Sequence, residues 1–138
     1  HLDPVRGSHI LFDRPLPVGF LLEAPRDCRP FFVLPYQGRT LVGTTEVRQS
    51  LDEPIECSSA ERDYLLEAYN HYFRAAMSPA DVAGSFAGVR PLIRSGPEVN
   101  RASREYKVER RGRLVIVYGG KWTTARRLGM EVARAAGR

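Results

Sequence analysis

Short apolar runs, each bounded by glycine or proline, occupy the first part of the chain. They are GSHILF (Gly7–Phe12), GFLLEA, PFFVLPY and RTLVGTTEV. Short runs of β-branched and aromatic residues between turn residues predict strands rather than helices. Gln37-Gly38 lies between the last two runs, and such a pair suits a two-residue hairpin turn. This part of the chain is therefore expected to form antiparallel strands.

A helical period replaces this pattern after the polar segment LDEPIECS. From Ser58 to Met77 apolar residues recur at helical spacing, at Leu65, Tyr69, Tyr72, Phe73 and Ala76. Ser58 and Glu61 fit a capping box at the start of this helix, and Pro79 is expected to end it. The aromatic stripe is interpreted as core packing, and His71 as a surface or half-buried histidine.

Extended structure is expected to resume in DVAGSFAGVRPLIR, and SREYKVERR with RLVIVY predicts a hairpin over Arg111-Gly112. Leu114–Val117 is wholly apolar, which predicts a strand buried on both faces. A last helix is expected from Thr123 to about Ala136, with Thr123 or Thr124 as N-cap. Its inward-facing residues would be Ala125, Leu128 and Val132. The fold class predicted by these elements is α+β, with a mostly antiparallel, mixed sheet and two main helices.

Composition adds few restrictions to this picture. The 138 residues, 43% of them hydrophobic and 27% charged, have the size of one domain that needs neither disulfides nor metal. The longest apolar runs, LVIVY and FFVL, are far too short to span a bilayer, and the first residues show no secretory signal. Cys28 and Cys57 lack metal-ligand spacing and favour a reducing compartment, so a cytoplasmic location is expected.

The net charge of +5 comes almost wholly from arginine, since Lys107 and Lys121 are the two lysines. A basic balance can indicate nucleic-acid binding. These arginines are scattered rather than gathered in one stripe, so a solvated basic surface is favoured over a nucleic-acid or anion-binding module. The main alternative is that a few buried arginines bind a small anion. The chain also contains neither a G-x-G-x-x-G dinucleotide fingerprint nor a Walker loop.

The segment VYGGKWTT combines an apolar strand, a glycine pair and the start of a helix. Gly119 and Gly120 would allow close approach of a flat or anionic ligand to the backbone. The following helix presents free N–H groups and a partial positive charge, to which Lys121 adds a full one. The segment therefore predicts a site that stabilises negative charge. The alternative is a simple glycine turn with a surface lysine and a threonine cap.

Arg90 precedes a proline in the largely apolar segment AGVRPL, where an unpaired charge would be costly to bury. Arg94 and Arg104 lie on neighbouring extended segments. If these side chains gather with Lys121, they form a phosphate-sized site, because guanidinium groups bind phosphate or carboxylate through paired hydrogen bonds. Pairing of the same arginines with acids of the chain remains the alternative.

Three further polar residues could serve such a site. His9, in GSHIL, is either a proton acceptor near the site or a satisfied interior histidine. Thr44 and Thr45, in GTTE, offer hydroxyl groups on a predicted strand, although threonine is common in strands for packing reasons alone.

Several segments together resemble the FAD-dependent glycerol-3-phosphate dehydrogenases, within the glycine/D-amino-acid oxidase-type flavoproteins. They are RGSHIL, FFVLPYQGRTLVGTTE, AERDYLLEAYNHYF, AGVRPL, SREY and VYGGKWTTARRL, and they cover nearly the whole chain. The resemblance implies a fragment that lacks the N-terminal FAD-binding part. Residues 1 to about 110 would then be the substrate-binding sheet domain, and residues from about 111 to 138 would complete the flavin site.

The resemblance also implies roles for individual residues. Arg90 and Arg104 would hold the substrate phosphate, and Lys121 would lie near the flavin and the reacting carbon. The flavin would be lined by Gly119, Gly120, Lys121, Trp122 and Thr123. His9 is a candidate base. Trp122 replaces the leucine or similar residue that is more usual in the family, which could alter packing against the ring.

The implied activity is oxidation of glycerol 3-phosphate to dihydroxyacetone phosphate, with electrons passed from FAD to quinone at a membrane surface. The isolated fragment is expected to be inactive and not to retain FAD, because the fingerprint that binds the ADP half is absent. One alternative is another FAD-dependent oxidase of the superfamily, acting on an amino or hydroxy acid. That enzyme would need one arginine for a carboxylate rather than several cations for a phosphate.

Overall fold

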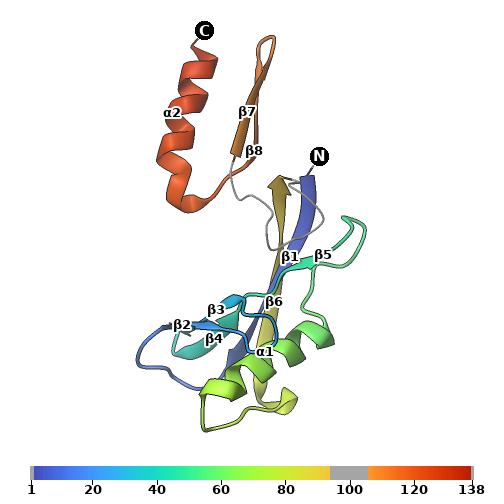
Figure 1. Cartoon of the computed structure of the whole chain (residues 1–138), viewed down its shortest axis with the longest axis vertical. Helices are drawn as coiled ribbons and strands as arrows, with labels where there is room; N and C mark the ends of the chain where they lie inside the picture. Colours follow the sequence, from blue (N-terminus) through green and yellow to red (C-terminus); the bar gives the residue numbers. More distant parts are fainter. Residues whose placement is uncertain (1, 94–105, 138) are drawn as a thin grey trace. The chain divides into compact units, whose positions relative to one another are not determined.

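The computed structural model describes residues 2–93 and 106–137 (Figure 1). Its elements are β1 (Leu2–Phe12), β2 (Phe20–Glu23), β3 (Pro30–Tyr36), β4 (Arg39–Gly43), β5 (Val47–Arg48), α1 (Ser59–Tyr72), η1 (Pro79–Asp81), β6 (Val82–Ile93), β7 (Tyr106–Arg111), β8 (Leu114–Gly119), η3 (Trp122–Thr124) and α2 (Ala125–Ala136). The predicted α+β class is confirmed.

The chain forms two compact units. We call the first, Arg6–Val47 with Leu51–Val89, the sheet–helix unit. We call the second the hairpin–helix unit; it comprises His1–Val5, Arg48–Ser50 and Arg90–Arg138 and contains β7, β8 and α2.

Neighbouring strands of the main sheet follow the order β2-β3-β4-β1-β5, and β6 also pairs with β1. The pairs β2/β3, β3/β4 and β1/β4 are antiparallel, as the sequence predicted. The turn between β3 and β4 has φ of 50° at Gln37 and 78° at Gly38. Positive φ at both central residues is what a tight hairpin with the normal strand twist requires, so the predicted turn is confirmed.

Alternation along the strands sends one set of side chains toward α1, which lies across one face of the sheet (Figure 1). The core formed there contains Ile10, Phe12, Phe31, Val33 and Val42 from the sheet and Leu65, Leu66, Ala68 and Tyr69 from the helix. Full burial of each large apolar side chain contributes about 1.5–3 kcal/mol. This core fixes β1 and β4 relative to α1.

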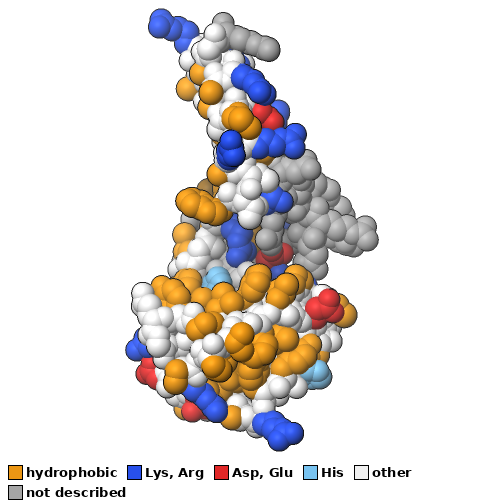
Figure 2. Space-filling view, turned by 90° about the vertical axis from the view of Figure 1, so that its left-hand side faces the viewer, with side chains coloured by type: hydrophobic (Ala, Val, Ile, Leu, Met, Phe, Trp, Pro, Cys, Tyr) orange, Lys and Arg blue, Asp and Glu red, His pale blue; other side chains and the backbone are white. Residues whose placement is uncertain are grey.

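The opposite face of the same sheet carries a second apolar set, which is partly exposed. Leu21 and Phe32 pair across β2 and β3 and are 64% and 46% exposed, and Phe86 of β6 is 45% exposed. We call this the open face. Hydrophobic side chains also gather over the outer side of the unit in the lower part of Figure 2. The open face is therefore a partly exposed apolar surface of the sheet.

Helix α1 begins as predicted and ends earlier. Ser58 and Glu61 form the capping box. The helix stops at Tyr72 rather than near Pro79, because the backbone of Phe73 is extended (φ −109°, ψ 125°). In this conformation the Phe73 ring stacks on the Tyr69 ring, with centroids 4.3 Å apart. Pro79 instead begins η1. Tyr72 and Ala76, both predicted in the buried stripe, are exposed, and His71 is a surface histidine as predicted.

In the hairpin–helix unit, β7 and β8 pair antiparallel across a turn with φ of 60° at Gly112. The prediction that Leu114–Val117 is buried on both faces is wrong: Leu114 is 59% and Val117 40% exposed. In the described part of the chain β8 pairs with β7 alone, and α2 contacts both strands.

The last helix begins two residues later than predicted, at Ala125, after the single 3-10 turn of η3. Thr124 occupies the N-cap position, but its hydroxyl donates to the Lys121 carbonyl oxygen at 3.1 Å and caps no N–H group. Leu128 and Val132 are half-buried as expected, whereas Ala125 is exposed. Among the described residues, no helix has the length and apolar character needed to cross a membrane.

Candidate functional site

The imidazole of His9 lies on the open face of the sheet–helix unit, held between its neighbours on two strands. His9 pairs with Gly43 of β4, and a Cβ at Gly43 would lie only 2.3 Å from His9 Cδ2. On the other side the ring stacks on Phe86 of β6, with centroids 4.9 Å apart and planes 13° apart. The glycine of GTTE is thus required by the ring that rests on it. The residue is half-buried, and its Nδ1 atom is not exposed to solvent.

Behind His9, on the α1 side of the sheet, a buried carboxylate gathers donors from three segments. Glu61 is 4% exposed. Its Oε2 accepts from Arg6 Nε and Nη2 at 3.0 and 2.7 Å and from the Ser58 hydroxyl at 2.7 Å. Its Oε1 accepts from the hydroxyls of Ser8 and Thr45 at 2.8 and 2.7 Å. The carboxylate therefore joins β1, the segment after β4 and the start of α1.

Glu61 is ionised in this setting. Burial alone would raise the pKa of this carboxyl, but hydrogen bonds from Thr45, Ser58, Arg6 and Ser8 outweigh burial and lower the pKa to about 2. Arg6, 9% exposed, is the matching cation. Removing either partner would leave the other as an uncompensated buried charge.

Thr45 links this network to the strand that carries His9. Its Oγ1 accepts the backbone N–H of Ser8 at 2.9 Å while donating to Glu61. Thr44 and Thr45 were expected on a strand, but β4 ends at Gly43 and both lie in the segment beyond it. Beyond the end of β4, the Thr45 side chain thus adds to the backbone bond between the Thr45 N–H and the Ser8 carbonyl.

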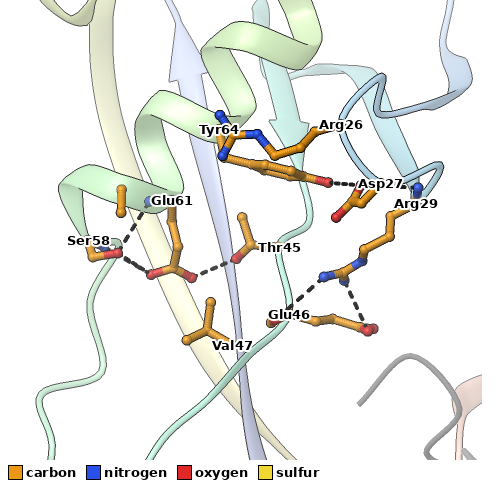
Figure 3. A pocket seen from close by; sticks show the side chains of 10 residues that line it. Arg26, Asp27, Arg29, Thr45, Glu46, Val47, Ser58, Glu61 and Tyr64 are labelled. Carbon is orange, nitrogen blue, oxygen red and sulfur yellow. Dashed lines mark hydrogen bonds and ion pairs between the residues drawn. The ribbon is translucent and has the colours of Figure 1, made fainter. Parts of the chain in front are cut away.

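A pocket of about 350 Å³ opens beside this network (Figure 3). Its lining includes Arg26, Asp27, Arg29, Thr45, Glu46, Glu61 and Tyr64. Arg29 pairs with Glu46 at 3.0 Å, Arg26 pairs with Glu67, and the Tyr64 hydroxyl donates to Asp27 at 2.9 Å. Burial, and then this hydrogen bond, raise the pKa of Tyr64 to about 12. For Arg26 and Arg29, pairing with acids of the chain is therefore the observed arrangement.

The glycine pair of VYGGKWTT has the backbone that only glycine adopts easily. φ is 69° at Gly119 and 102° at Gly120, and a Cβ at Gly120 would lie 3.3 Å from Leu128 Cδ2. Lys121 and Trp122 follow with exposed side chains, the indole 94% exposed. Thr123 is also exposed. The residues that follow the glycine pair are therefore exposed, and they lead through η3 into α2.

The cationic residues predicted to bind phosphate are only partly described. Arg90 lies on β6 and is half-buried, and Lys121 lies between β8 and η3. Arg94 and Arg104 lie outside the described residues. The gathering of Arg90, Arg104 and Lys121 therefore stays a prediction.

Sequence reasoning missed the buried pair between Arg6 and Glu61. The partners are 55 positions apart, and Glu61 was already explained by its capping box. The available signal was Arg6 itself, an arginine at the start of the apolar strand RGSHILF.

The chain belongs to a family of flavin enzymes. The family described as FAD dependent oxidoreductase matches residues 1–135, and the chain is a member of it.

The relatives narrow the resemblance to enzymes of polyol phosphates. The mitochondrial glycerol-3-phosphate dehydrogenase of Arabidopsis thaliana is 32% identical over 96% of this chain and 22% of its own length. The aerobic glycerol-3-phosphate dehydrogenase of Bacillus subtilis is 31% identical over 96% of this chain and 25% of its own. The D-erythritol 1-phosphate dehydrogenase of Brucella abortus is 36% identical over 90% of this chain and 26% of its own.

Among solved structures, the FAD complex of the glycerol-3-phosphate dehydrogenase from Bacillus halodurans matches with a TM-score of 0.75 and 29% identity. The match covers 99% of this chain and 28% of that one. The resemblance to glycerol-3-phosphate dehydrogenases is thus confirmed. The chain spans about a quarter of the length of the relatives it matches.

Proposed function

We propose that this chain is the substrate-binding part of a protein that oxidises glycerol 3-phosphate to dihydroxyacetone phosphate with FAD and passes the electrons to quinone. The observation that carries the proposal is the half-buried imidazole of His9, which lies between Gly43 and Phe86 in a chain whose relatives are dehydrogenases of phosphorylated polyols. Oxidation of a secondary alcohol requires a group that accepts its hydroxyl proton, and imidazole suits this task near neutral pH.

In this proposal, bound FAD supplies the acceptor for the hydride that leaves the alcohol carbon. His9 accepts the hydroxyl proton on the open face, beside the apolar side chains of Phe32 and Phe86. The carbonyl product forms as the C–H and O–H bonds break.

We propose that the segment after β8 lines the flavin. Both glycines have positive φ, and a Cβ at Gly120 would lie 3.3 Å from Leu128 Cδ2, so glycine keeps this turn close to α2. In the proposal the exposed side of the turn faces the flat ring. Lys121 and the start of the following helix would stabilise negative charge at the pyrimidine edge, with Trp122 and Thr123 beside it. We propose residues 1 to about 110 as the substrate-binding domain and the rest of the chain as the part that completes the flavin site.

Arg90, Arg104 and Lys121 would bind the substrate phosphate. Three cations match a phosphate dianion, whereas one arginine suffices for a carboxylate. This requirement separates a phosphorylated substrate from the amino or hydroxy acids used elsewhere among flavin oxidases.

A second candidate substrate is a longer polyol phosphate such as erythritol 1-phosphate. It is favoured by the relative from Brucella abortus, which is 36% identical over 90% of this chain. The shared chemistry is a secondary alcohol on a phosphorylated chain.

Steady-state turnover of the full-length, FAD-loaded protein with a quinone acceptor tests the proposal. Glycerol 3-phosphate or erythritol 1-phosphate should be oxidised, and unphosphorylated glycerol and simple amino acids should not. Oxidation of an amino acid with no turnover of either phosphate would contradict it.

Separation of the protein with membranes and its release by high salt would test attachment to a membrane surface. The 138-residue chain alone should purify without yellow colour.

A further inference from the structure

Two neighbouring backbone segments determine where the His9 ring can lie. Ser8 immediately precedes His9 on β1, and Thr45 follows the Gly43-Thr44 pair whose glycine supports the ring. The two segments are tied by the Ser8 N–H to Thr45 Oγ1 bond at 2.9 Å and by the Thr45 N–H to Ser8 carbonyl bond at 3.3 Å. Movement of either segment would move the imidazole relative to Gly43.

Both segments are held by the same oxygen of Glu61. Oε1 accepts the Ser8 and Thr45 hydroxyls, while Oε2 accepts Arg6 and the helix cap at Ser58. The carboxylate thus divides its two oxygens. Oε2 is bound to the helix start and the buried cation, and Oε1 to the two strand segments that flank His9. An ordinary capping box requires only the first of these functions.

We propose that Glu61, acting through Thr45 and Ser8, is a positioning residue that holds the His9 imidazole over Gly43 in the geometry needed for proton transfer. The inference rests on the proposed role of His9 in the oxidation. Catalysis is sensitive to such placement, because a displacement of about 1 Å can cost about a hundredfold in rate.

The linking residue can be changed without touching the Arg6–Glu61 pair. Thr45→Val removes the hydroxyl that joins Ser8 to Glu61, and Thr45→Ser keeps it. Thr40→Val is the control. Thr40 is 1% exposed and Thr45 3%, and the Thr40 hydroxyl donates a hydrogen bond to the Arg14 carbonyl oxygen at 2.7 Å. Thr40 pairs with Phe12, at the end of β1 away from Ser8.

In the full-length, FAD-loaded protein, Thr45→Val should lower kcat for glycerol 3-phosphate by about tenfold or more with KM within about twofold. Thr45→Ser should recover most of the rate. Thr40→Val should also lower Tm, by less than Thr45→Val because the Thr40 hydroxyl makes one hydrogen bond and the Thr45 hydroxyl two, and it should leave kcat within about twofold. Equal effects of Thr45→Val and Thr40→Val on kcat would overturn the positioning role, because both variants lose one buried hydroxyl.

A crystal structure of the full-length Thr45→Val protein gives a readout that does not depend on the substrate. The His9 ring should leave Gly43, and in Thr40→Val it should remain there. A ring that stays in place in Thr45→Val overturns the inference even if glycerol 3-phosphate is oxidised. A displaced ring in a protein whose wild type oxidises no polyol phosphate supports the positioning contact and overturns the proposed function instead.

Discussion

The buried carboxylate of Glu61 makes the stability of the sheet–helix unit depend on pH in a specific interval. Its pKa lies at about 2 in the folded protein against an ordinary value of 4.5. Because the folded pKa is depressed, the stabilisation is fully present above pH 4.5 and is lost as the pH falls toward 2. The difference between these two pKa values corresponds to about 3 kcal/mol of unfolding free energy.

Replacing the carboxylate should reproduce this loss at neutral pH. Glu61→Gln leaves Arg6, 9% exposed, without its counter-charge, and breaking a buried pair costs about 3–5 kcal/mol. We expect a clear fall in the unfolding temperature of the full-length protein at pH 7, measured by calorimetry. The difference between wild type and variant should narrow as the pH falls below 4.5, because the carboxyl then takes up a proton in the unfolded chain while it stays ionised in the folded protein down to about pH 2.

Asp81→Asn supplies the control. Asp81 occupies the same capping-box position in η1, where it accepts from the backbone and hydroxyl of Ser78 at 2.7 and 2.6 Å, but it is exposed. The Asp81→Asn variant should lower the unfolding temperature far less than the Glu61→Gln variant. Equal losses for the two variants at pH 7, or a Glu61→Gln difference that stays constant down to pH 3.5, would refute the reasoning about the buried pair.

Three further variants probe the proposed site in the full-length protein. Gly43→Ala places a Cβ 2.3 Å from His9 and should lower kcat about tenfold or more with unchanged FAD content; turnover near wild type would show that the ring seat is unimportant. Arg90→Lys should raise KM for glycerol 3-phosphate about tenfold through loss of a paired hydrogen bond, as steady-state kinetics will reveal. Gly120→Ala, at φ of 102° and 3.3 Å from Leu128, should reduce the FAD content of the purified protein, read from its absorbance.

Features set by neighbouring residues were predictable from the sequence. The Gln37-Gly38 hairpin depends on two residues that accept positive φ, and the start of α1 on a serine and a glutamate three positions apart. Both are local, so the sequence pattern contains all that determines them. The antiparallel strands and the α+β class follow from the same short-range signals.

Features set by tertiary packing were not predictable in this way. The end of α1 depends on the stacking of Phe73 on Tyr69, and the exposure of Leu114 depends on a sheet that has two strands among the described residues. The role of Glu61 depends on Arg6, far away in the sequence, which no local pattern joins to it. His9 was predicted as a candidate base, but its seat on Gly43 required the register of β1 against β4.

Anaerobic mixing of the full-length, FAD-loaded protein with glycerol 3-phosphate tests the central claim most directly, because reduction of the flavin is seen as loss of its visible absorbance. The account predicts rapid bleaching by glycerol 3-phosphate and none by glycerol, with bleaching slowed strongly in His9→Gln. A flavin that stays oxidised with every polyol phosphate but is bleached by an amino acid would contradict it.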